Sequence, residues 1–141
     1  MYEILYTSTA VKEFSEIELS SLLEEVRSKN TEVGITGMLV YYNQQFIQLL
    51  EGEESLIKEL YNNIELDPRH TSVERFYDGP IDHRTFSDWS MAFKVLDETL
   101  VAQNIPGYES FNTTESPMQK ILSSDPTTGK VMFLNLRSLL K

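Results

Sequence analysis

The chain has 141 residues, of which 40% are hydrophobic and 24% charged, a composition typical of one globular domain with or without a short appendage. Twelve basic and 22 acidic residues give a net charge of −10, which disfavours nucleic acid as a partner because phosphate binding needs a basic surface. The absence of cysteine excludes disulfides, thiolate metal sites and cysteine nucleophiles.

The first elements follow from the periodicity of apolar residues. Residues 2–8 alternate in side-chain character and predict a β-strand. Ser15 and Glu18 form a capping-box pattern that marks the start of a helix over residues 16–29. The apolar positions at helical spacing in this segment are Leu19, Leu22, Leu23 and Val26.

Two apolar segments, 35–42 and 45–51, are separated by Asn43-Gln44 and predict a hairpin of two largely buried strands. A second amphipathic helix follows and ends at Asp67-Pro68, because proline cannot continue a helix. Its apolar positions are Leu56, Ile57, Leu60 and Ile64.

Residues 71–77 and 91–96 predict the fourth and fifth strands. The resulting order β-α-β-β-α-β-β is a ferredoxin-like α+β arrangement with one extra strand. Right-handed connections place both helices on one face of a five-stranded mixed sheet.

The charge is divided unevenly along the chain. Residues 1–98 carry 19 acidic and 8 basic residues, whereas residues 99–141 carry 3 and 4. We therefore expect a domain over residues 1–98, followed by a linker and C-terminal helices within 99–141. Ser116-Pro117 and Asp125-Pro126 have the pattern of helix starts, the second ahead of the apolar run 131–136. These helices either cap the open face of the sheet or also form a surface for assembly.

Several polar or aromatic residues are candidates for a binding site. Gln48 lies within an apolar strand, so its amide either bonds to backbone at an irregularity or faces a polar ligand. Tyr6 on the neighbouring strand can point into the same layer, or be ordinary core. Asn30 lies at the mouth of that layer, where it also fits a helix C-cap. Trp89 alone is compatible with ordinary packing.

Enzymatic motifs are missing from the sequence. The two histidines, His70 and His83, have no carboxylate at metal-ligand spacing. No G-x-S-x-G, P-loop or G-x-G-x-x-G sequence occurs. The chain also contains no run of 18 apolar residues and no signal peptide. We therefore expect a cytoplasmic protein that is not an enzyme and binds no metal or membrane.

Taken together, the motifs resemble the BLUF family of blue-light sensors that use flavin. The resemblance covers roughly residues 1–97, with every motif in family order and spacing, which makes it specific. The segments that carry it are Ile4-Leu5-Tyr6-Thr7-Ser8, Asn30, Gly34-Ile35-Thr36-Gly37, Phe46-Ile47-Gln48-Leu49-Leu50-Glu51-Gly52, Asp67-Pro68-Arg69-His70 and Trp89-Ser90-Met91.

The resemblance implies a role for each matching position. Tyr6 and Gln48 match the photoactive pair, and Trp89 and Met91 match a signalling pair on the last strand. The resemblance also implies a non-covalent flavin, namely FAD, with FMN and riboflavin as alternatives. The residues implied to contact it are Lys29 and Asn30 beside the ring, and Asp67, Arg69 and His70 near the ribityl and phosphate end. Lys29 stands where many relatives carry Asn or His.

The family mechanism needs no cysteine. Light drives an electron and a proton from the tyrosine to flavin and back, which leaves a rearranged hydrogen-bond network and a red-shifted absorption. By resemblance to the short members of the family, we expect homo-oligomers and output through an unidentified signalling protein. The alternative is a light-insensitive ferredoxin-like protein of the same descent that binds a ligand or serves as a scaffold.

Overall fold

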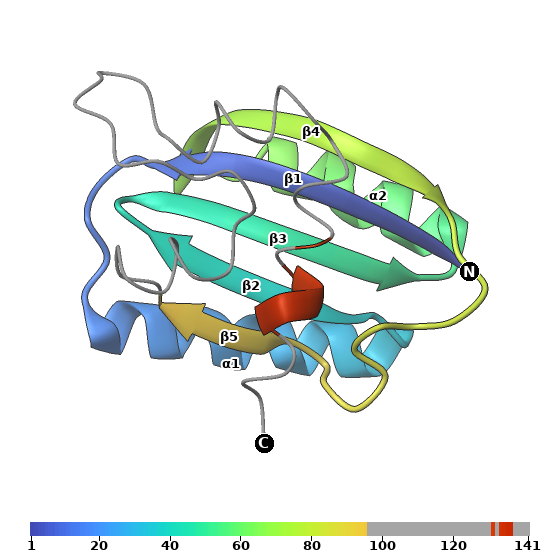
Figure 1. The fold of residues 1–141 in the computed structure, drawn as a ribbon. Helices are drawn as coiled ribbons and strands as arrows, with labels where there is room; N and C mark the ends of the chain where they lie inside the picture. The colour runs from blue at the N-terminus through green and yellow to red at the C-terminus, as the bar shows by residue number, and fades with distance from the viewer. Residues whose placement is uncertain (96–130, 132, 137–141) are drawn as a thin grey trace.

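The computed structural model describes residues 1–95, 131 and 133–136 (Figure 1). Its elements follow the predicted order. They are β1 (Tyr2–Ala10), α1 (Glu16–Val33), β2 (Thr36–Tyr42), β3 (Gln45–Gly52), α2 (Glu54–Glu65), β4 (His70–Pro80) and β5 (Ala92–Val95). The sheet order is β4-β1-β3-β2-β5, in which only the β2–β5 pair is parallel. The predicted α+β, ferredoxin-like fold with a mixed sheet is confirmed.

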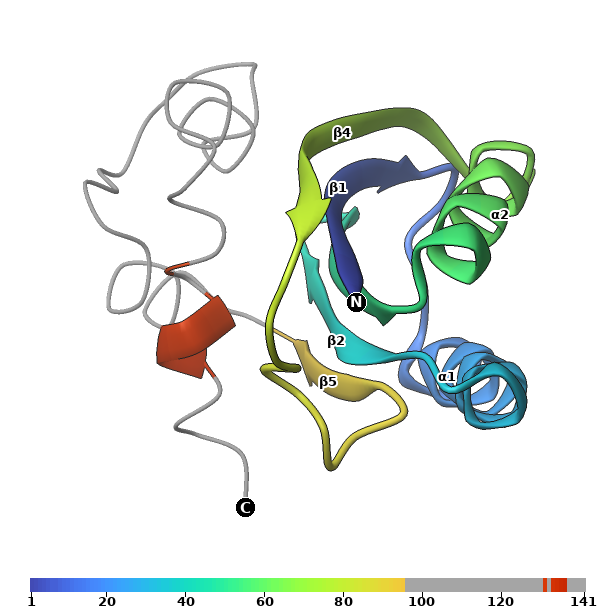
Figure 2. The same cartoon turned by 90° about the vertical axis from the view of Figure 1, so that its right-hand side faces the viewer.

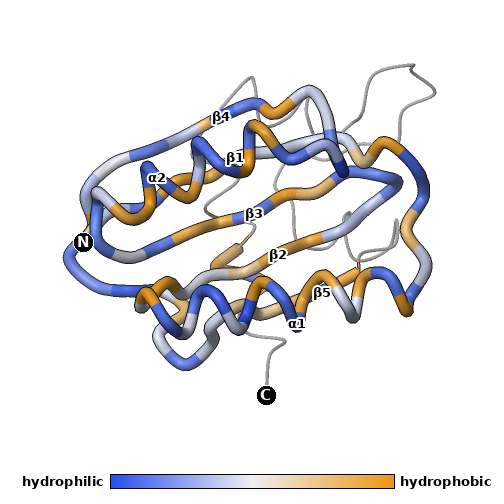
Figure 3. The backbone as a smooth tube through the Cα atoms, turned by 180° about the vertical axis from the view of Figure 1, so that it is seen from behind, coloured by the Kyte–Doolittle hydropathy of each residue, from blue (hydrophilic) through white to orange (hydrophobic). Residues whose placement is uncertain are grey.

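Alternate residues of a strand point to opposite faces of the sheet. Because β1, β2 and β3 carry apolar residues at successive positions, each face of the sheet has an apolar core. Ile4 and Leu50 belong to a helix-side core together with Leu23 of α1 and Ile57 of α2. Leu5, Val40 and Leu49 belong to an outer core on the other face. Figure 2 shows both helices on one side of the sheet, as predicted, and Figure 3 shows hydrophobic and hydrophilic residues alternating along each of them.

The capping box predicted for α1 is present, since Ser15 accepts from the Glu18 amide and Glu18 accepts from the Ser15 amide. The predicted end of the helix at residue 29 is wrong. The helix continues to Val33 and ends at Gly34, whose φ of 71° is the left-handed conformation that glycine adopts without strain. Asn30 is therefore not a C-cap but lies inside the helix. Among the helices that the structure describes, none is long and apolar enough to cross a membrane.

The turn between β2 and β3 is the one predicted from the sequence. Asn43 and Gln44 have φ angles of 49° and 61°, as a two-residue hairpin turn that matches the twist of the strands requires. The turn sets the register in which Tyr42 faces Gln45 and Leu39 faces Gln48.

The last two strands differ from the prediction at their ends. β4 runs from His70 to Pro80, beyond the predicted 71–77, because pairing with β1 continues along nearly the whole of that strand. β5 begins at Ala92, so the expected strand position of Trp89 and Met91 is wrong, and both residues precede it. The carbonyls of Ser90 and Met91 accept hydrogen bonds from side chains of α1.

A short segment near the C-terminus reaches the outer face of the sheet. Residue 131 and residues 133–136 are helical and are drawn in red in Figure 2. Phe133 and Leu136 are buried in the outer core. The other residues of the predicted segment 99–141, including Ser116-Pro117 and Asp125-Pro126, lie outside the described residues. The division at residue 98 and the capping or assembly role of the C-terminal helices stay predictions.

Gly37 lies where two strands of the sheet approach too closely for a side chain. A Cβ atom there would lie 2.0 Å from the carbonyl oxygen of Leu49, which is backbone and has little room to move. We expect Gly37→Ala to lower the free energy of unfolding by about 2–3 kcal/mol, the upper part of the usual range for overpacking. Urea unfolding monitored by circular dichroism measures this change.

Gly34→Ala is the matched control. A Cβ at Gly34 meets no atom within 4 Å, so that variant pays only for the left-handed backbone, about 1 kcal/mol. Equal losses in the two variants would contradict the close approach of β2 and β3 at Gly37.

Candidate functional site

A cavity of about 560 Å³ lies between the two helices and the sheet face that they cover. One part of its wall is apolar and comes from both helices and from β2 and β3, with Leu22, Val26, Leu39, Phe46, Leu60 and Ile64 among its residues. The cavity also brings together all seven residues that the sequence proposed for cofactor contact, namely Tyr6, Lys29, Asn30, Gln48, Asp67, Arg69 and His70. Their individual roles toward a cofactor stay predictions.

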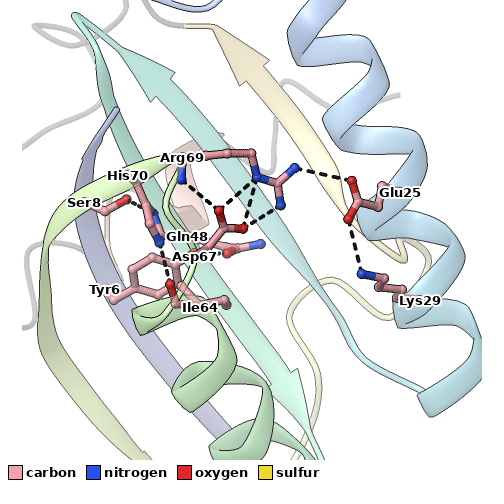
Figure 4. A network of polar contacts seen from close by, with 9 residues as sticks. All are labelled: Tyr6, Ser8, Glu25, Lys29, Gln48, Ile64, Asp67, Arg69 and His70. Carbon is pink, nitrogen blue, oxygen red and sulfur yellow. Dashed lines mark hydrogen bonds and ion pairs between the residues drawn. The ribbon is translucent and has the colours of Figure 1, made fainter. Parts of the chain in front are cut away.

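The inner end of the cavity is formed by Tyr6 and Gln48, which face each other across β1 and β3 (Figure 4). The Tyr6 hydroxyl donates a hydrogen bond to Oε1 of Gln48, and both side chains are buried. Within the described residues, Nε2 of Gln48 donates only to the sulfur of Met91, at 3.4 Å. Because a thioether is a weak acceptor, the amide retains donor capacity for a polar ligand in the cavity.

The residues before β5 are held by α1. Nδ2 of Asn30 donates to the carbonyl of Ser90 at 2.9 Å, and Nε of Arg27 donates to the carbonyl of Met91 at 2.9 Å. These two bonds fix the backbone on either side of the Met91 side chain. The Gln48 amide therefore contacts a segment that is tied both to the helix and to β5.

Trp89 and Met91 lie on opposite faces of the sheet. Met91 is buried in the helix-side core beside Gln48, whereas Trp89 packs on the outer core. The Trp89 ring meets Phe86 edge-on at 6.2 Å between centroids, and Phe86 meets Phe133 at 6.3 Å. Of the two residues proposed for signalling, Met91 alone contacts the pair at the inner end of the cavity.

Charged residues occupy the exposed rim of the cavity (Figure 4). Arg69 binds Asp67 at 2.5 Å and reaches across to Glu25 of α1 at 3.3 Å, and Lys29 binds Glu25 at 3.2 Å. The hydrogen bond from Arg69 lowers the pKa of Asp67, and the bond from Lys29 followed by the charge of Arg69 lowers the pKa of Glu25. The rim therefore carries two cations and two carboxylates that neutralise one another.

His70, the first residue of β4, joins the last turn of α2 to β1. One ring nitrogen lies 2.8 Å from the Ser8 hydroxyl and the other lies 2.5 Å from the carbonyl of Ile64. Because both ring nitrogens have protein partners, His70 contributes the surface of its ring to the cavity wall. Polar contacts with a ligand then come from other residues of the cavity. In the part of the chain that the structure describes, no group of three or more His, Cys, Asp or Glu residues is arranged to hold a metal ion.

Glu51 is a buried residue of this region for which the sequence suggested no role. Its carboxylate accepts from the hydroxyl of Thr36 and from the backbone amides of Thr85 and Phe86, at 2.7–2.9 Å. It thereby fixes the loop before Trp89 to β3. A charged residue inside an apolar strand is a signal of the same kind as Gln48. The contacts of Glu25 and Arg27 could not be predicted in this way, because both are ordinary exposed residues of an amphipathic helix.

Comparison with known proteins agrees with this arrangement. The family described as "BLUF: Sensors of blue-light using FAD" matches residues 1–92. The photoactivated adenylate cyclase subunit beta of Euglena longa is 35% identical over 89 residues, which is 62% of this chain and 10% of that protein. The blue light- and temperature-regulated antirepressor BluF of Escherichia coli K12 is 32% identical over 56 residues, 40% of this chain and 14% of that protein. The chain thus spans about a tenth of the length of the cyclase subunits it matches.

Solved structures give the same result for the fold. The dark-state structure of BlrB, a BLUF protein, superposes with a TM-score of 0.78 at 25% identity, covering 99% of this chain and 96% of that one. The ground state of BlsA superposes with a TM-score of 0.69 at 26% identity, covering 91% and 87%.

The buried position of Tyr6 makes a testable difference to stability in alkaline solution. Burial, followed by the nearby Tyr61 and Asp67, raises the pKa of Tyr6 above its usual value of 10.0. The unfolded chain therefore ionises this hydroxyl first, and the contribution of Tyr6 to stability is present below pH 10 and lost as the pH rises above it. Above pH 10, we expect the wild type to lose about 1.4 kcal/mol more per pH unit than Tyr6→Phe.

Urea unfolding of both proteins from pH 9 to pH 11 measures this slope. The lost hydrogen bond lowers the stability of Tyr6→Phe at every pH and leaves the slope unaffected, so the slope isolates the ionisation. Parallel curves for the two proteins would contradict the burial of the hydroxyl.

Proposed function

The chain belongs to the BLUF family of blue-light sensors that use FAD, and we propose that it responds to light by rearranging the hydrogen bond between Tyr6 and Gln48. The single observation that carries the proposal is the bond itself. It joins a buried phenol to a buried amide at the inner end of a ligand-sized cavity. A scaffold protein that had lost its light response would not need this pair, and either residue could be replaced by an inert one. In this chain both residues are present.

The residues around the cavity fit a non-covalent flavin. A volume of about 560 Å³ lies within the range of cofactor pockets, roughly 300–1,000 Å³. The apolar side chains of the two helices suit a planar ring, and the amides of Asn30 and Gln48 suit its polar edge. Arg69 suits the phosphate end, and so does Lys29, which was expected beside the ring but lies exposed and paired with the same carboxylate as Arg69. When bound, flavin supplies the absorption of blue light and the capacity to accept an electron.

Tyr6 and Gln48 then supply a reversible change with no covalent product. The Tyr6 hydroxyl holds its proton in the bond to Oε1 of Gln48. If a bound flavin accepted an electron from Tyr6, this proton would leave along the same bond, and the return of both would restore the phenol. Half a turn of the amide places Nε2 where Oε1 was, and the hydroxyl, which both donates and accepts, then accepts the bond. The same turn moves the donor away from the Met91 sulfur.

Variants of the pair test the proposal. We expect Tyr6→Phe and Gln48→Leu to bind flavin and to lose the small red shift that blue light produces in the wild type, because each variant lacks one partner of the bond. Absorption spectra of purified protein in the dark, after blue light and during recovery measure the shift. The matched control is Tyr77→Phe, which removes a hydroxyl on the outer side of the sheet and should keep the shift.

A normal light-induced shift in Tyr6→Phe or Gln48→Leu would contradict the proposed mechanism. A wild-type protein that takes up no flavin would instead favour the alternative of a light-insensitive ligand-binding or scaffold protein.

For the output, we infer that this chain acts through protein contacts and not as an enzyme. The contact from Gln48 to Met91 and the packing of Trp89 through Phe86 on Phe133 support a route from the cavity to the outer face. Assembly of several copies is part of the same proposal.

Met91 is the point at which this route is testable. We expect Met91→Ala to keep the red shift, because the Tyr6–Gln48 bond remains. The variant should lose most of the light-induced structural difference outside the cavity, measured by hydrogen–deuterium exchange of dark and lit protein. A full light-dependent difference in the variant would contradict a route through Met91.

A further inference from the structure

The polar groups of the cavity are separated into a buried end and an exposed end. Tyr6 and Gln48 lie at the buried end, whereas Glu25, Lys29 and Arg69 lie at the rim with side chains that are 44–71% exposed. Because burying a phosphate is costly, a phosphorylated ligand that fills this cavity places its phosphate at the rim. The rim therefore determines how the protein treats ligands that share a ring and differ in phosphate.

Lys29 and Arg69, the two cations at the rim, are already paired with carboxylates. Glu25 binds Lys29 at 3.2 Å and Arg69 at 3.3 Å, so one carboxylate holds both cations (Figure 4). No other Lys or Arg lines the cavity among the residues that the structure describes. A phosphate at the rim competes with Glu25 for these cations and lies close to its negative charge.

Glu25 differs from Asp67, the other carboxylate at the rim. Asp67 lies two residues before Arg69, accepts from the Arg69 amide at 2.9 Å and holds the guanidinium on its own loop. Glu25 comes from α1 and bridges the opening of the cavity to that loop. Removal of the Glu25 charge therefore frees Lys29 and leaves Arg69 paired with Asp67 alone, without releasing the loop.

We propose that Glu25 determines the preference of this cavity among flavins, by competing with the ligand's phosphate for Arg69 and Lys29. This inference rests on the proposed function, since it concerns the same cavity. With Glu25 in place, riboflavin and FMN bind with similar affinity. Without its charge, the phosphorylated forms FMN and FAD bind more tightly, and riboflavin, which carries no phosphate, does not.

The experiment measures dissociation constants of riboflavin, FMN and FAD for flavin-free wild-type protein and for Glu25→Gln, by titration of flavin fluorescence at low salt. We expect the ratio of FMN to riboflavin affinity to rise about threefold to fivefold in the variant, the size typical of charges at an exposed site. Raising the salt concentration should remove most of the gain, because the charges at the rim are screened.

Glu24→Gln is the matched control. It removes the same charge from the neighbouring exposed position of α1, and Glu24 does not line the cavity. Its affinity ratio should equal that of the wild type. In the double variant Glu25→Gln/Arg69→Gln, most of the rise in the ratio of FMN to riboflavin affinity should disappear. That result would show that the rise depends on Arg69.

Two negative results have different meanings. If every protein binds all three flavins and Glu25→Gln leaves the ratio unchanged, or if Glu24→Gln raises it equally, the role of Glu25 is overturned and the proposed function stands. If the wild type binds none of the three flavins, the proposed function itself is overturned.

Discussion

The hydrogen bond between Tyr6 and Gln48 depends on the register of β1 against β3, and the rest of the structure maintains that register. Tyr6 faces Gln48 directly in the antiparallel pair, and both side chains point toward the helices. A slip of one residue would turn Gln48 into the outer core. The hairpin turn at Asn43-Gln44 and the close approach of Gly37 fix β3 against β2. The antiparallel pairing from Tyr2–Gly52 to Thr9–Gln45 then fixes β3 against β1. The site is thus a consequence of sheet geometry, with a polar pair inserted into an apolar layer.

The two faces of the sheet are connected by the loop between β4 and β5. On the helix side, Asn30 and Arg27 bind the carbonyls next to the Met91 side chain, which contacts Gln48. On the outer side, Glu51 binds the amides of Thr85 and Phe86. One short loop therefore carries Met91 into the cavity layer and Trp89 into the outer core. This placement is the reason for which we propose the loop as the carrier of a signal out of the cavity.

The sequence predicted the fold and the inner end of the site because both depend on local patterns. Alternation and helical spacing identify every element in order, and Gln48 is recognisable as an amide within an apolar strand. Element ends were harder to predict. The helix continued past Asn30 because Gly34 supplied a better cap, and β4 extended through Pro80 because β1 offered partners. The contact between Glu25 and Arg69 spans 44 residues, so no local pattern could reveal it.

The most direct test of the account is the light-minus-dark infrared difference spectrum of flavin-bound protein with isotope-labelled glutamine. If light changes the hydrogen-bond partners of the Gln48 amide, the carbonyl stretch of a glutamine side chain must shift. A label-sensitive band is therefore expected in the wild type and not in Gln48→Leu. A light-induced red shift of the absorption spectrum with no label-sensitive band, or with the same band in both proteins, would contradict the central claim.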